Sequence, residues 1–112
     1  MNKQQPNWYG FEMLSLYLSI SEGHLETCKE QLQNLEAIQN RPYILDDNTV
    51  DRIIKLCNNE NEFTSLYIEQ CRRWRDQNPT KQQLDDICQL ESNERKHEEI
   101  NKKILFLANN QA

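Results

Sequence analysis

Two prolines, Pro42 and Pro79, divide this sequence into three long segments that contain very few other helix breakers. Proline lacks the backbone N–H that continues a helical hydrogen-bond ladder, and it pushes the residue before it out of helical geometry. The chain has 112 residues but only two glycines, whereas an all-β chain needs a turn about every 8–12 residues. These features favour long helices and argue against an all-β fold.

The first segment has the periodicity of a helix that packs against neighbouring helices at a shallow angle. Its mainly apolar seam alternates steps of three and four residues, which is the spacing of the a and d positions of a heptad. A second stripe widens the apolar face in the N-terminal half only. We expect a helix over about 8–40, with the seam at Phe11, Leu14, Leu18, Ser21, Leu25, Cys28, Leu32 and Leu35 and the second stripe at Met13, Tyr17 and Ile20.

The second segment carries two neighbouring stripes, which predict a helix over about 49–77 with a wide buried face. Possible N-cap residues precede it at Asp46–Thr49. Glu60 and Asn61 interrupt both stripes at one level, and a polar residue at a core position fixes register or leaves room for a partner. The stripes consist of Val50, Ile54, Cys57, Asn61, Thr64, Ile68 and Cys71, and of Ile53, Leu56, Glu60, Phe63, Tyr67, Gln70 and Trp74.

The third segment predicts a helix over about 80–109, whose start has two alternative caps. Asn78 can cap it ahead of the second proline, or Thr80 can cap it together with Gln83 in a capping box. Aliphatic residues lie towards both ends of this segment, but the stretch Glu91–Glu99 contains none. We therefore expect the centre of this helix to contribute little packing and the helix to detach readily.

Short connections make successive helices antiparallel. The sequence thus predicts an all-α fold, a single domain over 1–112 built as an antiparallel three-helix up-down-up bundle with long helices. Only 37% of the residues are hydrophobic, and three helices of this length bury a limited core. We expect a partner or dimerisation to complete the bundle to four or more helices.

The balance of charge disfavours two classes of partner. The formal net charge is -5, from 13 Lys and Arg against 18 Asp and Glu. Basic residues supply most of the affinity for nucleic acid and for anionic membrane surfaces, so we expect neither partner. No run of apolar residues is long enough to span a bilayer, and the start at Met1–Pro6 lacks the apolar region of a signal peptide. A cytoplasmic location is expected.

No cluster of residues predicts an enzyme, a metal centre or a cofactor. Glu94 and His97 form one E-x-x-H pair, but a di-iron bundle needs two such pairs and further glutamates, and His24 lies in a different helix. We interpret His97 and its glutamate neighbours as a solvated charged face. The cysteines form no C-x-x-C pair, and we expect those on the stripes to be buried thiols, with a disulfide or redox switch as the alternative. They are Cys28, Cys57, Cys71 and Cys88.

The second helix carries the best candidate for a partner-binding surface. Its aromatic residues Phe63, Tyr67 and Trp74 share one face, and arginines adjoin them, a composition typical of interface hot spots. Plain core packing is the alternative for the aromatic residues, and compensation of the helix dipole is the alternative for the arginines. The candidate site consists of Phe63, Tyr67, Ile68, Cys71, Arg72, Trp74 and Arg75.

Two parts of the sequence have the pattern of a known family. Ser21–Glu26 places a glycine among acidic residues after the opening apolar run, and Glu60–Phe63 with Glu69–Arg72 has an Asn-Glu … Gln-x-Arg pattern. These segments resemble the flagellar export chaperones typified by FliT, although His24 and Leu25 replace the usual acid and Trp. The resemblance implies a chaperone for a late export substrate such as the filament-cap protein. It also implies binding to a flagellar transcriptional regulator and to the export gate, with the last helix masking the partner surface.

We therefore expect a non-enzymatic helical protein-binding module, most concretely a FliT-like export chaperone. It holds an amphipathic helix of an export substrate or regulator on the second helix, and the third helix, about 80–109, acts as a lid. The alternative is a structural or assembly subunit of a secretion apparatus, or another permanent helical oligomer. A homodimer is compatible with both hypotheses.

Overall fold

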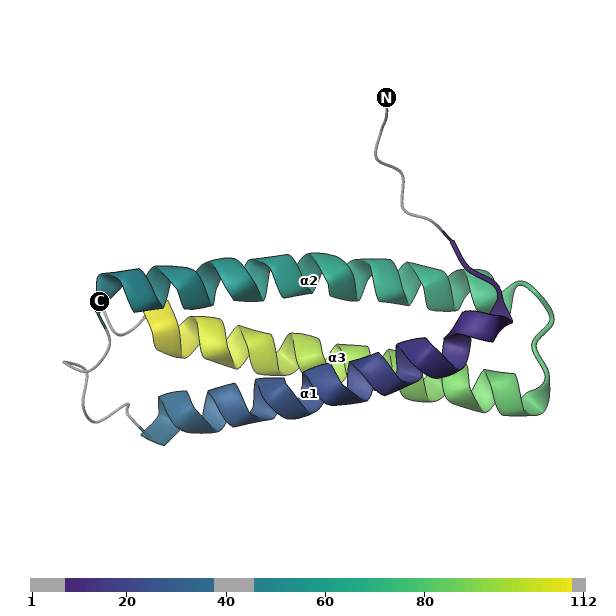
Figure 1. The fold of residues 1–112 in the computed structure, drawn as a ribbon, viewed down its shortest axis with the longest axis horizontal. Helices are drawn as coiled ribbons and strands as arrows, with labels where there is room; N and C mark the ends of the chain where they lie inside the picture. The colour runs from purple at the N-terminus through teal and green to yellow at the C-terminus, as the bar shows by residue number, and fades with distance from the viewer. Residues whose placement is uncertain (1–7, 38–45, 110–112) are drawn as a thin grey trace, which may run out of the picture.

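The computed structural model describes residues 8–37 and 46–109, which form three long helices and no strand (Figure 1). α1 and α3 run in the same direction and α2 runs antiparallel to both (Figure 1). This confirms the all-α three-helix bundle with up-down-up order. The elements are the 3₁₀-helix η1 (Phe11–Met13) and the α-helices α1 (Leu14–Ala37), α2 (Asp47–Arg75) and α3 (Lys81–Asn109).

The predicted start of the first helix near residue 8 is wrong, because the chain is first attached to α2. The Tyr9 N–H donates to Gln70 Oε1 at 2.9 Å, and the Tyr9 carbonyl accepts from Gln70 Nε2 at 3.3 Å and from Trp74 Nε1 at 2.9 Å. Gly10 then keeps an extended backbone (φ -81°, ψ 179°) before η1 begins. Two of these hydrogen bonds occupy the Tyr9 carbonyl, which in a helix starting at residue 8 would accept from the Met13 N–H; that N–H donates to the Gly10 carbonyl instead. The predicted end, 38–40, lies outside the described residues.

Both later helices begin with the caps that the sequence offered. The Asp46 carboxylate accepts from the Thr49 N–H at 2.8 Å, and this hydrogen bond lowers the pKa of Asp46. At α3 the structure selects the capping box: the Thr80 N–H donates to Gln83 Oε1 at 2.9 Å, and the Gln83 N–H donates to Thr80 Oγ1 at 3.1 Å. The box satisfies two backbone donors at the start of α3, and the Asp46 side chain satisfies one at the start of α2.

The predicted seam of the first helix is confirmed and leads into two separate cores. Leu14, Ser21, Leu25, Cys28 and Leu35 are the buried residues of α1. The aromatic core, at the end of the bundle where α2 ends, consists of Leu14, Cys71, Trp74, Ile87 and Leu90. The aliphatic core, towards the opposite end, consists of Cys28, Leu35, Cys57 and Ile104.

α3 lies between the other two helices, and its centre is buried. It packs along both α1 and α2, which approach each other much less closely (Figure 1). Asn93, Glu94 and His97 are only 2–3% exposed. The expectation of a weakly packed centre is therefore wrong, and so is the interpretation of Glu94 and His97 as a solvated face. The residues of α1 and α2 that face the centre of α3 include small and polar ones, so polar contacts replace aliphatic contacts there. For example, the Asn93 amide donates to Ser21 Oγ at 3.1 Å.

Candidate partner-binding surface

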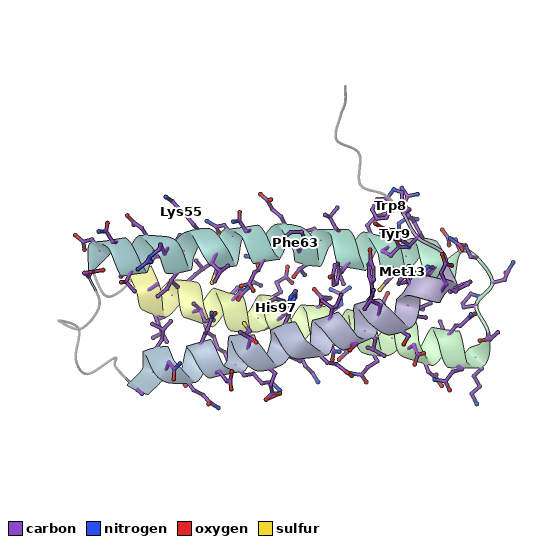
Figure 2. All side chains as sticks on the ribbon, in the orientation of Figure 1. Trp8, Tyr9, Met13, Lys55, Phe63 and His97 are labelled. Carbon is purple, nitrogen blue, oxygen red and sulfur yellow. The ribbon has the colours of Figure 1, made fainter. Side chains whose placement is uncertain are left out.

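A hollow lies between the start of α1 and the C-terminal half of α2. Figure 2 shows Phe63 on α2 towards the middle of the bundle, with Trp8 and Tyr9 near the end of the same helix. Four of the residues around this hollow are well exposed: Phe63 is 59%, Tyr9 38%, Leu66 37% and Trp8 36% accessible. We call this surface the aromatic groove; it is lined by Trp8, Tyr9, Tyr17, Phe63, Leu66, Tyr67 and Gln70.

Stacked rings fix the walls of the aromatic groove. The Tyr17 ring lies 5.0 Å from Tyr67, 5.5 Å from Trp74 and 5.8 Å from Tyr9, centroid to centroid. Such pairs contribute about 0.5–1.5 kcal/mol each beyond the area that they bury. Burial raises the pKa of both Tyr17 and Tyr67, so the phenols stay neutral. The Arg73 guanidinium stacks 4.3 Å from the Trp8 ring, which holds the outer edge in place.

The structure separates the predicted apolar site residues into three places. Phe63 and Tyr67 line the aromatic groove. Cys71 and Trp74 are fully buried in the aromatic core, where core packing was the alternative interpretation. Ile68 lines a different hollow together with Thr64, Ser65, Arg95 and Glu98. In this structure a partner therefore has access to Phe63 but not to Cys71 or Trp74.

The two predicted arginines are engaged in ion pairs within the protein. Arg72 Nε donates to both carboxylate oxygens of Glu69, at 3.0 and 3.1 Å. Arg75 Nε and Nη2 donate to Glu91 on α3 at 3.0 and 2.6 Å, and Nη2 also approaches Cys88 Sγ at 3.3 Å. These interactions raise the pKa of both arginines. Arg75 thus links α2 to α3, and neither arginine lines the aromatic groove.

Sequence reasoning missed five residues of the aromatic groove: Trp8, Tyr9, Tyr17, Leu66 and Gln70. Two signals were present. Tyr17 belongs to the second stripe of the first helix, and Gln70 interrupts the second stripe of the next helix with a hydrogen-bonding group. The contribution of residues 8–10 was not predictable in this way, because it depends on side chains of α2 that bind an extended backbone.

A polar layer lies at mid-length, beside the aliphatic core, with which it shares Cys28 and Cys57. Asn101 is fully buried, and its Oδ1 accepts from the Cys28 thiol at 3.1 Å and from the Cys57 thiol at 3.8 Å. Its Nδ2 donates to Asn61 Oδ1 at 3.3 Å. Burial raises the pKa of Cys28 to about 12 and that of Cys57 to about 11, so both remain protonated donors. The polar layer is defined here as Cys28, Cys57, Glu60, Asn61, Glu94, His97 and Asn101.

Part of the polar layer is incompletely paired. His97 Nε2 lies 3.7 Å from Glu60 Oε2, beyond normal hydrogen-bond distance. Glu60 Oε1, Glu94 Oε2 and His97 Nε2 are buried and have no hydrogen-bond partner within the described parts of the chain. Burial raises the pKa of Glu94, against smaller opposing effects of His97 and Thr64. The polar layer thus contains buried polar atoms that could still form hydrogen bonds.

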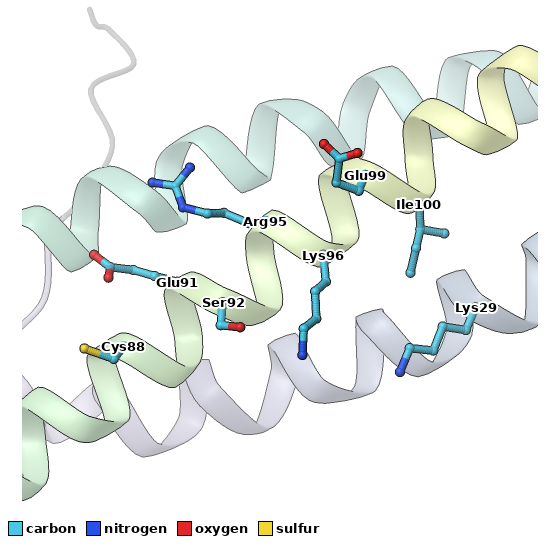
Figure 3. A pocket seen from close by; sticks show the side chains of 8 residues that line it. All are labelled: Lys29, Cys88, Glu91, Ser92, Arg95, Lys96, Glu99 and Ile100. Atoms are coloured by element: carbon cyan, nitrogen blue, oxygen red, sulfur yellow. The ribbon is translucent and has the colours of Figure 1, made fainter.

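A third hollow, between α1 and α3, is lined by charges of both signs. Lys29 and Lys96 extend into the space between the two helices, and Ile100 lies beside them (Figure 3). Glutamates and an arginine also lie along it, and Cys88 is its exposed thiol. The lining consists of Lys29, Cys88, Glu91, Ser92, Arg95, Lys96, Glu99 and Ile100.

Within residues 8–37 and 46–109, no three His, Cys, Asp or Glu side chains are grouped so that they could hold a metal ion. None of the helices described is both long and apolar enough to cross a membrane. In comparisons with known proteins, no family model, no curated protein and no solved structure matches the chain.

Proposed function

We propose that this protein is a non-enzymatic protein-binding module that holds an amphipathic helix of a partner in the aromatic groove. The observation that carries the proposal is the exposure of Phe63 beside the half-buried Tyr17 and Tyr67. Docking of an apolar helix face into such a groove is a common mode of peptide recognition. Aromatic residues at the centre of an interface commonly supply most of the binding energy.

The arrangement of the helices supports a helical partner. α1 and α2 lie on either side of α3 and approach each other much less closely, so a partner helix can pack across the pair over the aromatic groove. Tyr9 is fixed to α2 by three hydrogen bonds and closes one end of this groove. Walls that are ordered before binding reduce the entropy that binding costs.

The more specific form of the proposal is a cytoplasmic export chaperone of the FliT type. It rests on the resemblance of Ser21–Glu26 and of α2 to that family, together with the small size and acidic charge of the chain. In this proposal α3 supports α1 and α2 beneath the groove instead of acting as a lid, because its centre is buried between them.

A site-specific crosslink tests the proposal. A photoreactive phenylalanine analogue replaces Phe63 in one chain and Leu84, which is 37% exposed on α3, in a control chain. Both are expressed in the native cells and irradiated. We expect position 63 alone to crosslink a different protein, and the crosslinked peptide to belong to an amphipathic helix. Equal labelling from both positions, or none from position 63, contradicts the proposal.

The second candidate function is a permanent homo-oligomer, such as an assembly subunit. Exposed leucines on all three helices favour it: Leu16 is 49%, Leu56 45% and Leu84 37% accessible. In that case position 63 crosslinks a second copy of this chain, and sedimentation gives one oligomeric mass at every protein concentration.

A further inference from the structure

Glu60 of the polar layer lies on the same side of α2 as two residues that line the aromatic groove, Phe63 and Tyr67. It precedes Phe63 by one helical turn and Tyr67 by two. The Glu60 side chain is 23% exposed, yet its Oε1 is buried and lacks a hydrogen-bond partner in the described residues. One carboxylate is thus accessible to a bound partner and incompletely paired in the free protein.

Basic residues of the described chain do not neutralise this carboxylate. The ion pairs of Arg72, Arg73 and Arg75 go to Glu69, Asp76 and Glu91, and His97 is the one basic group within 4.0 Å of Glu60 among the described residues, at 3.7 Å. A partly buried carboxylate without a cation or hydrogen-bond donors is costly. A partner that supplies a cation removes this cost on binding, so the interaction is selective for basic side chains.

We propose that the helix held in the aromatic groove carries one Lys or Arg directed at Glu60, next to an apolar residue packed on Phe63. This inference rests on the proposed function and adds the chemistry of the partner. The ammonium or guanidinium group donates to the exposed part of the Glu60 carboxylate. The net charge of -5 adds a long-range attraction for a basic partner.

The length of the groove limits the partner segment. From Glu60 to Gln70 the α2 axis rises about 15 Å, the length of roughly ten helical residues. Residues 8–10 close the end near Gln70. The basic residue therefore lies at the opposite end of the bound segment, and apolar residues follow it at helical spacings towards Tyr9.

A selection experiment tests this inference. The probe is a displayed library of amphipathic helical peptides of about 15 residues, the length at which an isolated helix begins to be stable. The apolar face is fixed and the flanking positions are randomised. The library is selected against the full chain and against its Glu60→Gln, Glu62→Gln and Phe63→Ala variants. Glu62 is an exposed carboxylate on the same helix and is the matched control.

We expect the selected peptides to require Phe63 and to share a Lys or Arg at one fixed position. Their affinity should fall about tenfold or more on Glu60→Gln, because a charge-assisted hydrogen bond is lost, and stay unchanged on Glu62→Gln. Circular dichroism checks that every variant keeps its helices. Peptides that need Phe63 but show no basic preference, or that bind Glu60→Gln equally well, overturn the inference and leave the proposed function in place. Absence of any Phe63-dependent peptide overturns both.

Discussion

The aromatic core and the polar layer use the same three helices but differ in how their contacts are satisfied. In the aromatic core Trp74 is fully buried, its ring packs on Tyr17 at 5.5 Å and its Nε1–H donates to the Tyr9 carbonyl. In the polar layer Glu94 and His97 are buried and Glu60 is partly buried, but each retains a buried polar atom without a partner among the described residues.

The difference indicates separate roles for the two regions. Apolar burial stabilises a bundle without selecting one register, whereas buried polar groups destabilise registers in which they are not paired. We therefore expect the aromatic core to supply most of the stability, and the polar layer to fix the alignment of α3 and the chemistry of the groove. Substitutions in the aromatic core should therefore lower the free energy of unfolding more than substitutions in the polar layer.

Removal of α3 should have the largest effect. A chain that ends at Gln77 loses the helix that packs on both α1 and α2, so both cores and the polar layer disappear together. We expect its helical circular dichroism to collapse, and a synthetic peptide of residues 78–109 to restore it in trans. A truncated chain that keeps the helicity of α1 and α2 supports instead the detachable lid expected from the sequence.

The Trp74→Ala variant should lose about 3–5 kcal/mol of unfolding free energy, since a fully buried ring leaves a cavity and the Tyr9 carbonyl loses a donor. The control is Phe63→Ala, which removes a ring that is 59% exposed and should cost well under about 1 kcal/mol. Urea unfolding of both variants measures the difference. Similar losses would show that the aromatic groove, and not the core beneath it, carries the stability of this end.

These two aromatic residues also show what the sequence can and cannot predict. Heptad spacing predicted the helices and the α1 seam because burial along a helix follows its period, as at Leu14, Leu25 and Cys28. Spacing places Phe63 and Trp74 on the same side of α2, but it cannot tell which one α1 and the 8–10 segment cover. That depends on tertiary packing, which left one ring in the core and the other in the groove.

The burial of the centre of α3 was missed for a similar reason. A stretch without aliphatic residues indicates a solvated helix unless polar partners face it, and those partners belong to other segments. Ser21 on α1 and Asn61 on α2 meet Asn93 and Asn101 across the bundle. Seen alone, each of these residues looks like a polar interruption in a stripe. Together they bury the centre of α3.

Asn101→Ala should have an intermediate effect, because it breaks the centre of the polar layer. The substitution leaves the Cys28 and Cys57 thiols and the Asn61 amide oxygen without the partner that they share. A loss of about 1–3 kcal/mol is expected from buried groups left unpaired. The control, Asn109→Ala, alters an exposed residue at the end of the same helix and should change little. Urea unfolding measures both variants. If they have the same free energy of unfolding, the polar layer does not have the structural role that we assign to it.

The smallest effect concerns the pH dependence of Glu94. Burial raises its pKa in the folded state above the ordinary value of 4.5, so the folded chain binds this proton more tightly than the unfolded chain. Stability linked to this group is therefore greatest at and below about pH 4.5 and decreases as the pH rises through the folded-state pKa.

Glu94→Gln keeps the shape of the side chain but cannot ionise. We expect this variant to be more stable than the parent near pH 7, with a difference that shrinks as the pH approaches about 4. Urea unfolding at a series of pH values measures it, with Glu99→Gln as the control because that carboxylate is 66% exposed. A difference that stays constant or grows towards low pH would mean that the ionised form of Glu94 is stabilised in the bundle. The polar layer would then already stabilise an ionised carboxylate without the cation that we assign to a partner.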